Sequence, residues 1–368
     1  MKLNLKEQLR MLALMLALPM VFVACSDDDD NDPTGGAPIV AQKGVFVFDT
    51  GNQGKNIDGA LSFIDEKTNT AINDVFRTVN ARSLGSTVQD GVILGQNLYI
   101  AVSESNTIEV VDKNTLVSVA QIAPTAEQGS KPRDIVTDGK YVYVSMYSGH
   151  VSRIDASKNV IDKTVKVGPN PEEMAVANGC LYVVNSDGLN WEAGYVNGKS
   201  VSKIDLASFA ETKIPVGLNP TKIVADASGN LLVICMGNYS DVPASIWKIS
   251  SSDAVEDWGK PATIMAVKGN SLYTVYDSYA GADAVEYTVY NTLTGSVEKD
   301  NFVASPVDSP SGIVVDPDNG NIFITSYTLV GGFASYTTPG YVNEYSADGT
   351  FVKKYDVGVG AVCMTFLK

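Results

Sequence analysis

The feature that most constrains the fold of this chain is a unit of roughly 40–50 residues that recurs along most of its length. Each copy begins with a polar start and an apolar run, and then has a Gly or Asn turn and an aromatic-rich strand. A strand ending in Ile-Asp or a similar pair follows, and then a strand rich in Thr and Val. Many copies open on an X-Pro pair, with prolines 39 to 49 residues apart: Pro132, Pro171, Pro220, Pro261 and Pro310.

Each unit holds four short strands in which apolar and polar residues alternate. Four strands in a repeat of this length are typical of a propeller blade, and the 3.6-residue periodicity of helical repeats does not occur. Six full units occupy residues 88–358, and an N-terminal piece supplies three more strands at residues 44–48, 60–65 and 71–76. We therefore predict an all-β, seven-bladed β-propeller. The C-terminal strand, residues 360–366, joins blade 1 and removes the open edges of the ring.

The N-terminus predicts export. Three basic residues precede an apolar run at residues 11–23, which is shorter than the roughly 20 residues that span a bilayer. Cys25 ends this run after a small residue, so residues 1–24 are interpreted as a lipoprotein signal peptide and Cys25 as the lipid anchor. Residues 22–25 resemble a bacterial lipobox, with Phe22 where Leu is commonest. Ordinary cleavage beside an incidental cysteine is the alternative.

Residues 25–38 are predicted to be an acidic, flexible tether, because like charges repel and Gly and Pro resist regular structure. The acidic run directly after the cysteine resembles the surface-export signal of Bacteroidetes lipoproteins, and a solvated spacer is the alternative. No second linker follows, so residues 39–368 are assigned to the propeller. The formal net charge of −15 argues against nucleic-acid binding, which needs clustered Lys and Arg.

The repeat resembles the YVTN or YncE-like bacterial propellers, most clearly at residues 166–171 and 181–185. Residues 45–54 are similar to the first blade of a family of Bacteroidetes surface lipoproteins that includes the corrinoid-capturing BtuG type. This resemblance implies a protein lipid-anchored to the outer membrane and exposed at the cell surface. It would bind cobalamin (vitamin B12) or another corrinoid as a ligand, not a cofactor, and transfer it to a TonB-dependent transporter. Other family members have no assigned ligand, so the fold does not fix the function.

The loops between the second and third strands of each blade share one face with the blade-to-blade links, and they are rich in aromatic residues. Aromatic rings offer a large, stiff contact area, and exposed apolar patches usually mark binding surfaces. Packing of each ring onto its own blade is the alternative. The ligand-contacting residues predicted on this face are Tyr147, Asn185, Trp191, Tyr195, Tyr239, Tyr276, Tyr279, Tyr327, Phe333 and Tyr336.

The starts of the blades place a second set of polar residues near the propeller axis: Gln89, Asp90, Arg133, Glu172, Glu173, Thr221, Lys222 and Thr263. Such groups can hydrogen-bond the amides or hydroxyls of a ligand. Loop capping and hydration of the central channel are the alternative roles. Arg133, Glu172 and Lys222 are the members that we predict to contact the ligand.

Enzymatic chemistry is not predicted. The chain has one histidine, His150, and no nucleophile elbow or phosphate-binding loop. Residues 316–321 look like a calcium loop but lack the glutamate of an EF-hand, and Cys180, Cys235 and Cys363 lie in apolar strands at no metal-like spacing. We therefore predict a binding protein without metal or cofactor. A propeller enzyme of the lactonase or lyase type and a glycan- or protein-binding module remain as alternatives.

Overall fold

A computed structural model of the protein describes residues 41–278 and 285–368. The predicted signal peptide (1–24), the anchor Cys25 and the tether (25–38) lie outside the described residues. Within the described part, no helix is long and apolar enough to cross a membrane.

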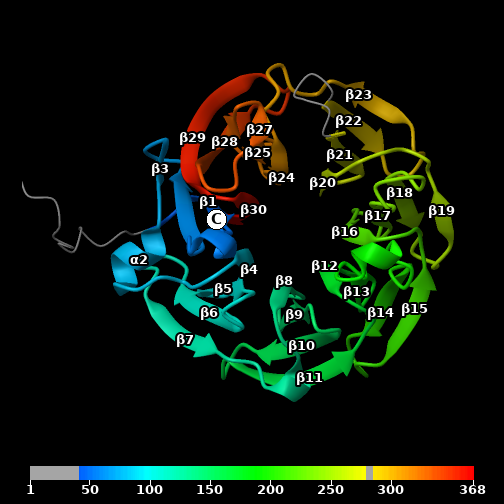
Figure 1. Ribbon diagram of the computed structural model, residues 1–368, viewed down its shortest axis with the longest axis horizontal. Helices are drawn as coiled ribbons and strands as arrows, with labels where there is room; N and C mark the ends of the chain where they lie inside the picture. The colour runs from blue at the N-terminus through cyan, green and yellow to red at the C-terminus, as the bar shows by residue number, and fades with distance from the viewer. Residues whose placement is uncertain (1–40, 279–284) are drawn as a thin grey trace, which may run out of the picture. The chain divides into compact units, whose positions relative to one another are not determined.

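Seven four-stranded antiparallel sheets form a ring of blades around one axis (Figure 1). The prediction of a seven-bladed propeller is thereby confirmed. The strands of blades 1 to 4, each from the axis outward, are β30, β1, β2 and β3 (Ala361–Leu367, Gly44–Asp49, Ala60–Asp65, Thr70–Ile72); β4 to β7 (Val88–Leu94, Asn97–Val102, Thr107–Asp112, Ser118–Ile122); β8 to β11 (Pro132–Thr137, Val142–Met146, His150–Asp155, Val160–Lys166); and β12 to β15 (Pro171–Ala177, Cys180–Asn185, Ser200–Asp205, Glu211–Pro215).

The strands of blades 5 to 7 follow in the same order: β16 to β19 (Pro220–Ala225, Leu231–Cys235, Ser245–Ile249, Val255–Asp257); β20 to β23 (Ile264–Lys268, Ser271–Tyr276, Glu286–Asn291, Val297–Asp300); and β24, β25, β28 and β29 (Pro310–Val315, Ile322–Ser326, Pro339–Tyr345, Phe351–Val359). A two-stranded hairpin, β26–β27 (Leu329–Val330, Phe333–Ala334), is inserted in blade 7.

The ring closes between the two ends of the propeller. The C-terminal β30 runs antiparallel to β1, with Gly44 opposite Leu367 and Asp49 opposite Ala361, so the red and blue strands lie side by side in Figure 1. β30 thereby becomes the innermost strand of blade 1. Closure by the C-terminal strand is confirmed, and it covers an edge of β1 that would otherwise be open to pairing.

The hydrophobic core is divided among the interfaces between neighbouring blades. Seven clusters of buried side chains each join two adjacent sheets. One of them packs Tyr99 and Ala101 of blade 2 against Val142 and Val144 of blade 3. The alternating pattern in the sequence follows from this arrangement, because each strand turns apolar side chains toward neighbouring sheets.

The recurring Ile-Asp pairs end the third strand of several blades. Each aspartate turns its carboxylate back onto the backbone of the following turn. Asp112 Oδ1 accepts from the N–H of Asn114 at 3.0 Å and Thr115 at 2.8 Å, and Asp205 Oδ1 accepts from Ser208 N at 2.7 Å. A carboxylate that satisfies two successive amides stops the strand, which explains why the pair recurs at this position.

One predicted strand is wrong beyond its first residues. β3 ends at Ile72, and Val75–Asn80 forms a short helix, α2, where the sequence pattern predicted a strand through Phe76. Val75 and Phe76 are both buried in the cluster between blades 1 and 2. A short apolar pair is buried equally well from a helical turn, so period-2 alternation could not locate the end of the strand.

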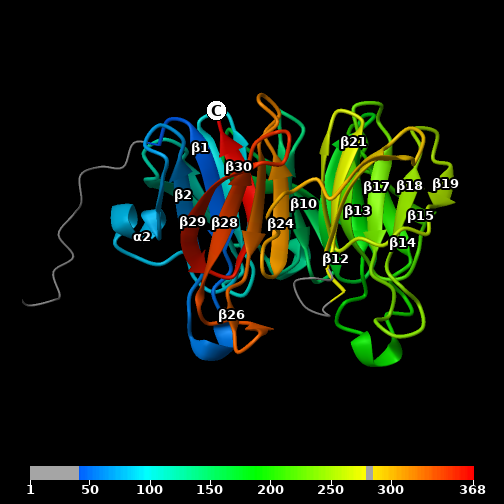
Figure 2. The same ribbon diagram turned by 90° about the horizontal axis from the view of Figure 1, so that it is seen from above.

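The connections between the second and third strands project from one face, which we call the loop face (Figure 2). In that view the β26–β27 hairpin and the short 3₁₀ helices Gln53–Lys55 and Trp191–Ala193 lie at the lower edge, and the C-terminus lies at the upper edge. A further 3₁₀ turn, Ala126–Gln128, links blades 2 and 3. In blades 2 and 3 only residues 103–106 and 147–149 join the second strand to the third.

Candidate functional site

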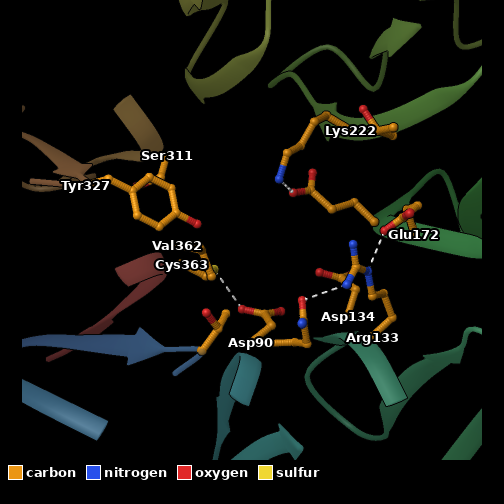
Figure 3. Close-up of a pocket in the computed structure, with 13 residues that line it drawn as sticks. Asp90, Arg133, Asp134, Glu172, Lys222, Ser311, Tyr327, Val362 and Cys363 are labelled. Carbon is orange, nitrogen blue, oxygen red and sulfur yellow. Dashed lines mark hydrogen bonds and ion pairs between the residues drawn. The ribbon is translucent and has the colours of Figure 1, made fainter. Parts of the chain in front are cut away.

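The inner strands place two residues from the start of most blades at the mouth of the central channel. A cavity of about 370 Å³ lies there, which we call the channel cavity. Its lining consists of Thr50, Gln89, Asp90, Arg133, Asp134, Glu172, Glu173, Thr221, Lys222, Ser311, Tyr327, Val362 and Cys363. The side chains with charges come from blades 2 to 5, and Tyr327, Ser311 and Val362 face them from the opposite wall (Figure 3).

The cationic groups of this cavity are held by neighbouring side chains. Arg133 Nε donates to Glu172 Oε2 at 2.5 Å, Arg133 Nη1 donates to Gln89 Oε1 at 3.0 Å, and the guanidinium lies 5.2 Å from the centre of the Tyr147 ring. Lys222 Nζ donates to Glu173 Oε1 at 2.5 Å. Figure 3 shows both ion pairs. Charge-assisted bonds of this length fix the side chains in place.

The carboxylates of this wall connect each blade to the next. Asp90 Oδ2 accepts from the backbone N–H of Ile135 at 3.1 Å, and Asp134 Oδ2 accepts from Met174 N at 2.8 Å. Glu173 Oε2 accepts from the next blade's backbone in the same way, at 3.3 Å from Ile223 N. One carboxylate therefore bridges each of the three junctions between blades 2, 3, 4 and 5.

Burial shifts the protonation of these groups. It raises the pKa of Asp90 and Glu173, and it raises the pKa of Asp134 well above its usual range, with the nearby charge of Asp90 adding to the effect. Repulsion between two nearby carboxylates favours the protonated form of Asp134.

Cys363 and Lys222 complete this wall. Cys363 Sγ donates to Asp90 Oδ1 at 2.8 Å, and burial together with that carboxylate raises the pKa of the thiol well above its usual range. Burial opposes the charged form of Lys222, but the adjacent Glu173 outweighs it and the pKa of the amine is raised. The Lys222 side chain still keeps 31 % of its surface exposed, because it faces the channel.

A second concave region, which we call the tyrosine groove, extends from the channel cavity toward the loops of blades 5 to 7. It comprises two cavities of about 330 and 310 Å³ that share Met236, Tyr239, Thr263 and Asp277. The larger one also shares residues with the channel cavity, so the three form a continuous depression. The lining of the groove consists of Thr221, Met236, Tyr239, Ser240, Val242, Pro243, Ala244, Thr263, Ile264, Tyr276, Asp277, Ser278, Ser309, Pro310, Ser311, Tyr327, Ala334, Tyr336 and Val362.

Two ring contacts brace the loops around the groove, one within the blade 7 loop and one between the loops of blades 4 and 5. The Tyr327 and Tyr336 rings pack edge to face with centroids 5.0 Å apart, and the Tyr195 and Tyr239 rings pack likewise at 6.0 Å. Asn52 Nδ2 donates to the backbone oxygen of Tyr336 at 2.9 Å and joins the blade 1 loop to that of blade 7. The groove wall is therefore built from several loops that brace one another.

The structure separates the residues predicted from sequence into four groups. Arg133, Glu172 and Lys222 line the channel cavity, with Tyr147 stacked behind Arg133. Tyr239, Tyr276, Tyr327 and Tyr336 line the groove. Trp191 and Phe333 stand at loop tips, 64 % and 80 % exposed, and line none of these three cavities, while Tyr195 reaches the groove only through Tyr239. Tyr279 lies outside the described residues.

Asn185 belongs to none of these surfaces. Its side chain is fully buried in blade 4, where Nδ2 donates to Ser202 Oγ at 3.0 Å and to Ser200 Oγ at 3.1 Å. His150 is half-buried on β10 and lines none of the three cavities. Among residues 41–278 and 285–368, no group of three or more His, Cys, Asp and Glu side chains is placed to hold a metal ion.

Sequence reasoning missed two acidic residues of the site. Asp134 occupies the same blade position as Asp90 and Glu173, so alignment of the blade starts could have found it. Asp277 follows β21 directly, in a connection between the second and third strands of its blade. These connections differ in sequence from blade to blade, so no repeated pattern pointed to this residue. The acidic loop at residues 316–321 is a turn, as predicted, and Lys368 Nζ donates to both Asp316 and Asp318.

Comparison with known proteins identifies a family and a fold. A family model described as "Domain of unknown function (DUF5074)" matches residues 43–360. Among solved structures, the hydrazine synthase of Kuenenia stuttgartiensis aligns with a TM-score of 0.54 and 16 % identity, covering 72 % of this chain and 86 % of the other. U3-55K aligns with a TM-score of 0.54 and 8 % identity, covering 74 % and 82 %. At such identities the likeness concerns the fold alone.

A curated protein, Laccase-1 of Melanocarpus albomyces, is 36 % identical over 53 residues. The match covers 14 % of this chain and only 8 % of the length of that relative. A segment of that size is about one blade long, so it carries no argument about activity.

Proposed function

The chain belongs to the DUF5074 family, and we propose that it is a non-enzymatic binding protein which captures a bulky, nearly neutral ligand on its loop face. The leading ligand is cobalamin or a related corrinoid. The protein is lipid-anchored through Cys25 at the outer-membrane surface and delivers its ligand to a TonB-dependent transporter. The anchor and the transporter rest on the N-terminal sequence and on the resemblance to corrinoid-capturing lipoproteins.

One observation supports the binding role above the others, namely the continuity of the tyrosine groove with the channel cavity. A corrinoid is a wide ring with methyl groups and amides around its rim. The groove offers rings for the apolar part and the hydroxyls of Thr221, Thr263 and Ser311 for the amides. Ligand sites commonly combine a mostly apolar wall with a few convergent polar groups. The same lining fits a neutral glycan, which is the second candidate.

The test is calorimetry of the purified propeller with cyanocobalamin. Burial of a ring is worth roughly 1.5–3 kcal/mol. Tyr336→Ala should therefore weaken binding about tenfold to a hundredfold at 1.4 kcal/mol per decade. Phe351→Ala, which removes an exposed ring from the outer strand β29, is the matched control and should bind like the wild type. Trp191→Ala shows whether the ligand extends to the loop tips.

Absence of heat and of a thermal shift at high micromolar cyanocobalamin would contradict the corrinoid assignment. A neutral oligosaccharide panel then tests the glycan candidate on the same groove variants. Chemical change in the recovered ligand would instead point to the lactonase or lyase alternative.

A further inference from the structure

The rim of the loop face is uneven in height. In blades 1, 4, 5 and 7, the connection between the second and third strands is at least nine residues long. These four connections are residues 50–59, 186–199, 236–244 and 327–338. They include the hairpin and the 3₁₀ helices that lie at the lower edge in Figure 2. In blades 2 and 3 the corresponding turns, 103–106 and 147–149, have only four and three residues, and we call this part of the rim the low side.

The low side adjoins the channel cavity. Each of its two blades contributes two residues to the cavity lining, namely Gln89, Asp90, Arg133 and Asp134. Val102, the last residue before one turn, pairs with Val88, and Met146, the last before the other, pairs with Pro132. Each turn therefore begins beside the residues that line the cavity. Because the cavity is continuous with the tyrosine groove, the whole concave region is open at this end.

Both turns of the low side are fastened to the link that enters their own blade. Ser105 Oγ accepts from the backbone N–H of Ser86 at 2.8 Å, and Ser148 Oγ accepts from that of Ser130 at 2.8 Å. Turns of this length extend no more than roughly 5–7 Å from the strands that they join, since an extended chain spans about 3.3–3.6 Å per residue. The low side therefore stays open when the groove is occupied.

The low side is polar and its charges are paired. Ser105 and Ser148 are exposed, and Lys131 Nζ lies 3.0 Å from Glu104 Oε1. Among the described residues, none of the large exposed apolar side chains lies in either turn, whereas the long connections carry several, with Trp191 among them. A polar, uncharged chain keeps its hydration over such a surface, and an apolar chain gains nothing there by burial. The two ends of the concave region therefore suit different chemistry.

We propose that the concave region takes a ligand with two parts, a bulky head that lies in the tyrosine groove and a polar, uncharged extension, such as a sugar chain, that leaves over blades 2 and 3. This inference rests on the proposed function in so far as the groove is taken as the site of the head. It adds the shape of the ligand class and the direction of its extension. The extension needs no partner in the charged wall, whose groups are bonded to one another.

A series of probes with one head and a growing extension tests the direction. Phenyl β-glucoside, phenyl β-cellobioside and phenyl β-cellotrioside are added at high millimolar concentration, and amide chemical shifts of the labelled protein are recorded. We expect all three to shift resonances of residues that line the groove. The two longer probes should also shift residues 103–106 and 147–149 and leave residues 186–199 unchanged. Their affinity should not fall below that of the glucoside.

A variant with a raised low side tests the opening itself. A second copy of residues 187–198 is inserted between Ser148 and Gly149. In the matched control, the same segment is inserted between Gly139 and Lys140, which are exposed in a turn on the opposite face of the same blade. The raised variant should lose at least about tenfold in affinity for the cellotrioside and less than about threefold for the glucoside. The control should bind both like the wild type, and melting temperatures show whether each variant is folded.

Cyanocobalamin links this test to the proposed function. It is measured free and with a polyethylene glycol chain attached at the ribose 5′-hydroxyl or at a peripheral amide. At least one conjugate should bind the wild type within about threefold of the free ligand, a difference of about 0.7 kcal/mol, and bind the raised variant far more weakly. If cyanocobalamin does not bind but the glycosides behave as expected, the corrinoid proposal fails and the open low side stands as the exit of the extension.

Three outcomes overturn the inference. The first is that the extension of a bound glycoside shifts the long connections of blades 4, 5 or 7 in place of the two short turns. The second is that cyanocobalamin binds while every conjugate and every longer glycoside is rejected, which leaves the corrinoid proposal intact. The third is that no probe of either kind binds. If the raised variant does not fold, the shift map of the wild type decides between these outcomes.

Discussion

The two halves of the ring differ in what begins their inner strands. Blades 2 to 5 begin with Gln89 and Asp90, Arg133 and Asp134, Glu172 and Glu173, and Thr221 and Lys222. Blades 6, 7 and 1 present Thr263, Ser311 and Gly312, and Val362 and Cys363 at the corresponding places. The first half ties blade to blade through carboxylates, and the second half carries most of the tyrosine groove.

On the proposed function, this difference separates the residues that stabilise the ring from those that contact the ligand. In blades 2 to 5 the charged groups bond to neighbouring blades, which leaves them little free capacity for a ligand. In blades 6, 7 and 1 the inner strands begin with neutral side chains. Among the described residues, no carboxylate on these inner strands accepts an N–H from the inner strand of the next blade. The neutral half depends instead on β30, whose backbone oxygen at Ala361 accepts from Ser311 Oγ at 2.7 Å.

The largest effect should come from removing this strand. A chain truncated after Gly360 loses Met364, Phe366 and Leu367 from the clusters on both sides of blade 1. Each large side chain contributes roughly 1.5–3 kcal/mol of burial free energy, and a whole domain has only about 5–15 kcal/mol of stability. We expect loss of the cooperative thermal transition, measured by circular dichroism, together with aggregation through the exposed edge of β1.

A chain that lacks only Lys368 is the control for this truncation. It keeps β30 and loses the ion pairs of Lys368 with Asp316 and Asp318. Asp316 is buried and Lys368 is 30 % exposed, so the loss of this pair should cost roughly 1–3 kcal/mol. This control should therefore still melt cooperatively, at a somewhat lower temperature than the full chain. An unchanged melting curve for the longer truncation would contradict the view that the neutral half depends on β30.

The fold was predictable because its signals are repeated. The X-Pro openings, the Ile-Asp strand ends and the alternation recur in most blades, so seven blades and the closing strand followed from the pattern alone. Where a feature occurs once, prediction was weaker. The helix at Val75–Asn80 replaced part of a predicted strand because two apolar residues carry no usable period.

The site was predictable in part for the same reason. The blade starts repeat, and most of the residues predicted there line the channel cavity. The loops do not repeat, so sequence could nominate their aromatic residues but could not order them in space. Tyr336 and Phe333 are three residues apart, yet the first lines the groove, while the second is 80 % exposed in the β26–β27 hairpin and lines none of the three cavities. Asn185 looked like a loop residue and is buried inside its blade.

A smaller effect should follow from Lys222→Met, which leaves Glu173 without its cation in the channel. Breaking a buried pair costs about 3–5 kcal/mol and an exposed pair about 0–1 kcal/mol. The two side chains are each about 30 % exposed, so we expect a loss of roughly 1–3 kcal/mol in urea unfolding. Affinity for cyanocobalamin should change less than about threefold if this half serves stability alone.

The double variant Lys222→Met with Glu173→Gln is the matched comparison. It removes both charges, and the glutamine oxygen can still accept from Ile223 N, so most of the lost stability should return. If Lys222→Met keeps its stability and loses the ligand, Lys222 contacts the ligand directly and the division between the halves fails.

The smallest effect concerns the protonation of Asp134, which burial and the nearby charge of Asp90 favour. The pKa of Asp134 is raised well above its usual value of 3.8, so the folded protein binds this proton more tightly than the unfolded chain does. That advantage is fully present below the unfolded value and is lost as the pH rises through the folded pKa. Asp134→Asn keeps an oxygen to accept from Met174 N and carries no negative charge at any pH. We therefore expect its melting temperature to match the wild type near pH 4, to exceed it by a few degrees near pH 8, and to vary less between these two pH values.

The control is Asp138→Asn, in the turn between β8 and β9. Backbone and side-chain hydrogen bonds lower the pKa of Asp138, so this variant should not flatten the pH profile of the melting temperature in the same direction. A wild-type pH slope retained in Asp134→Asn would mean that the proton resides elsewhere in the charged wall, with Glu173 as the next group to test.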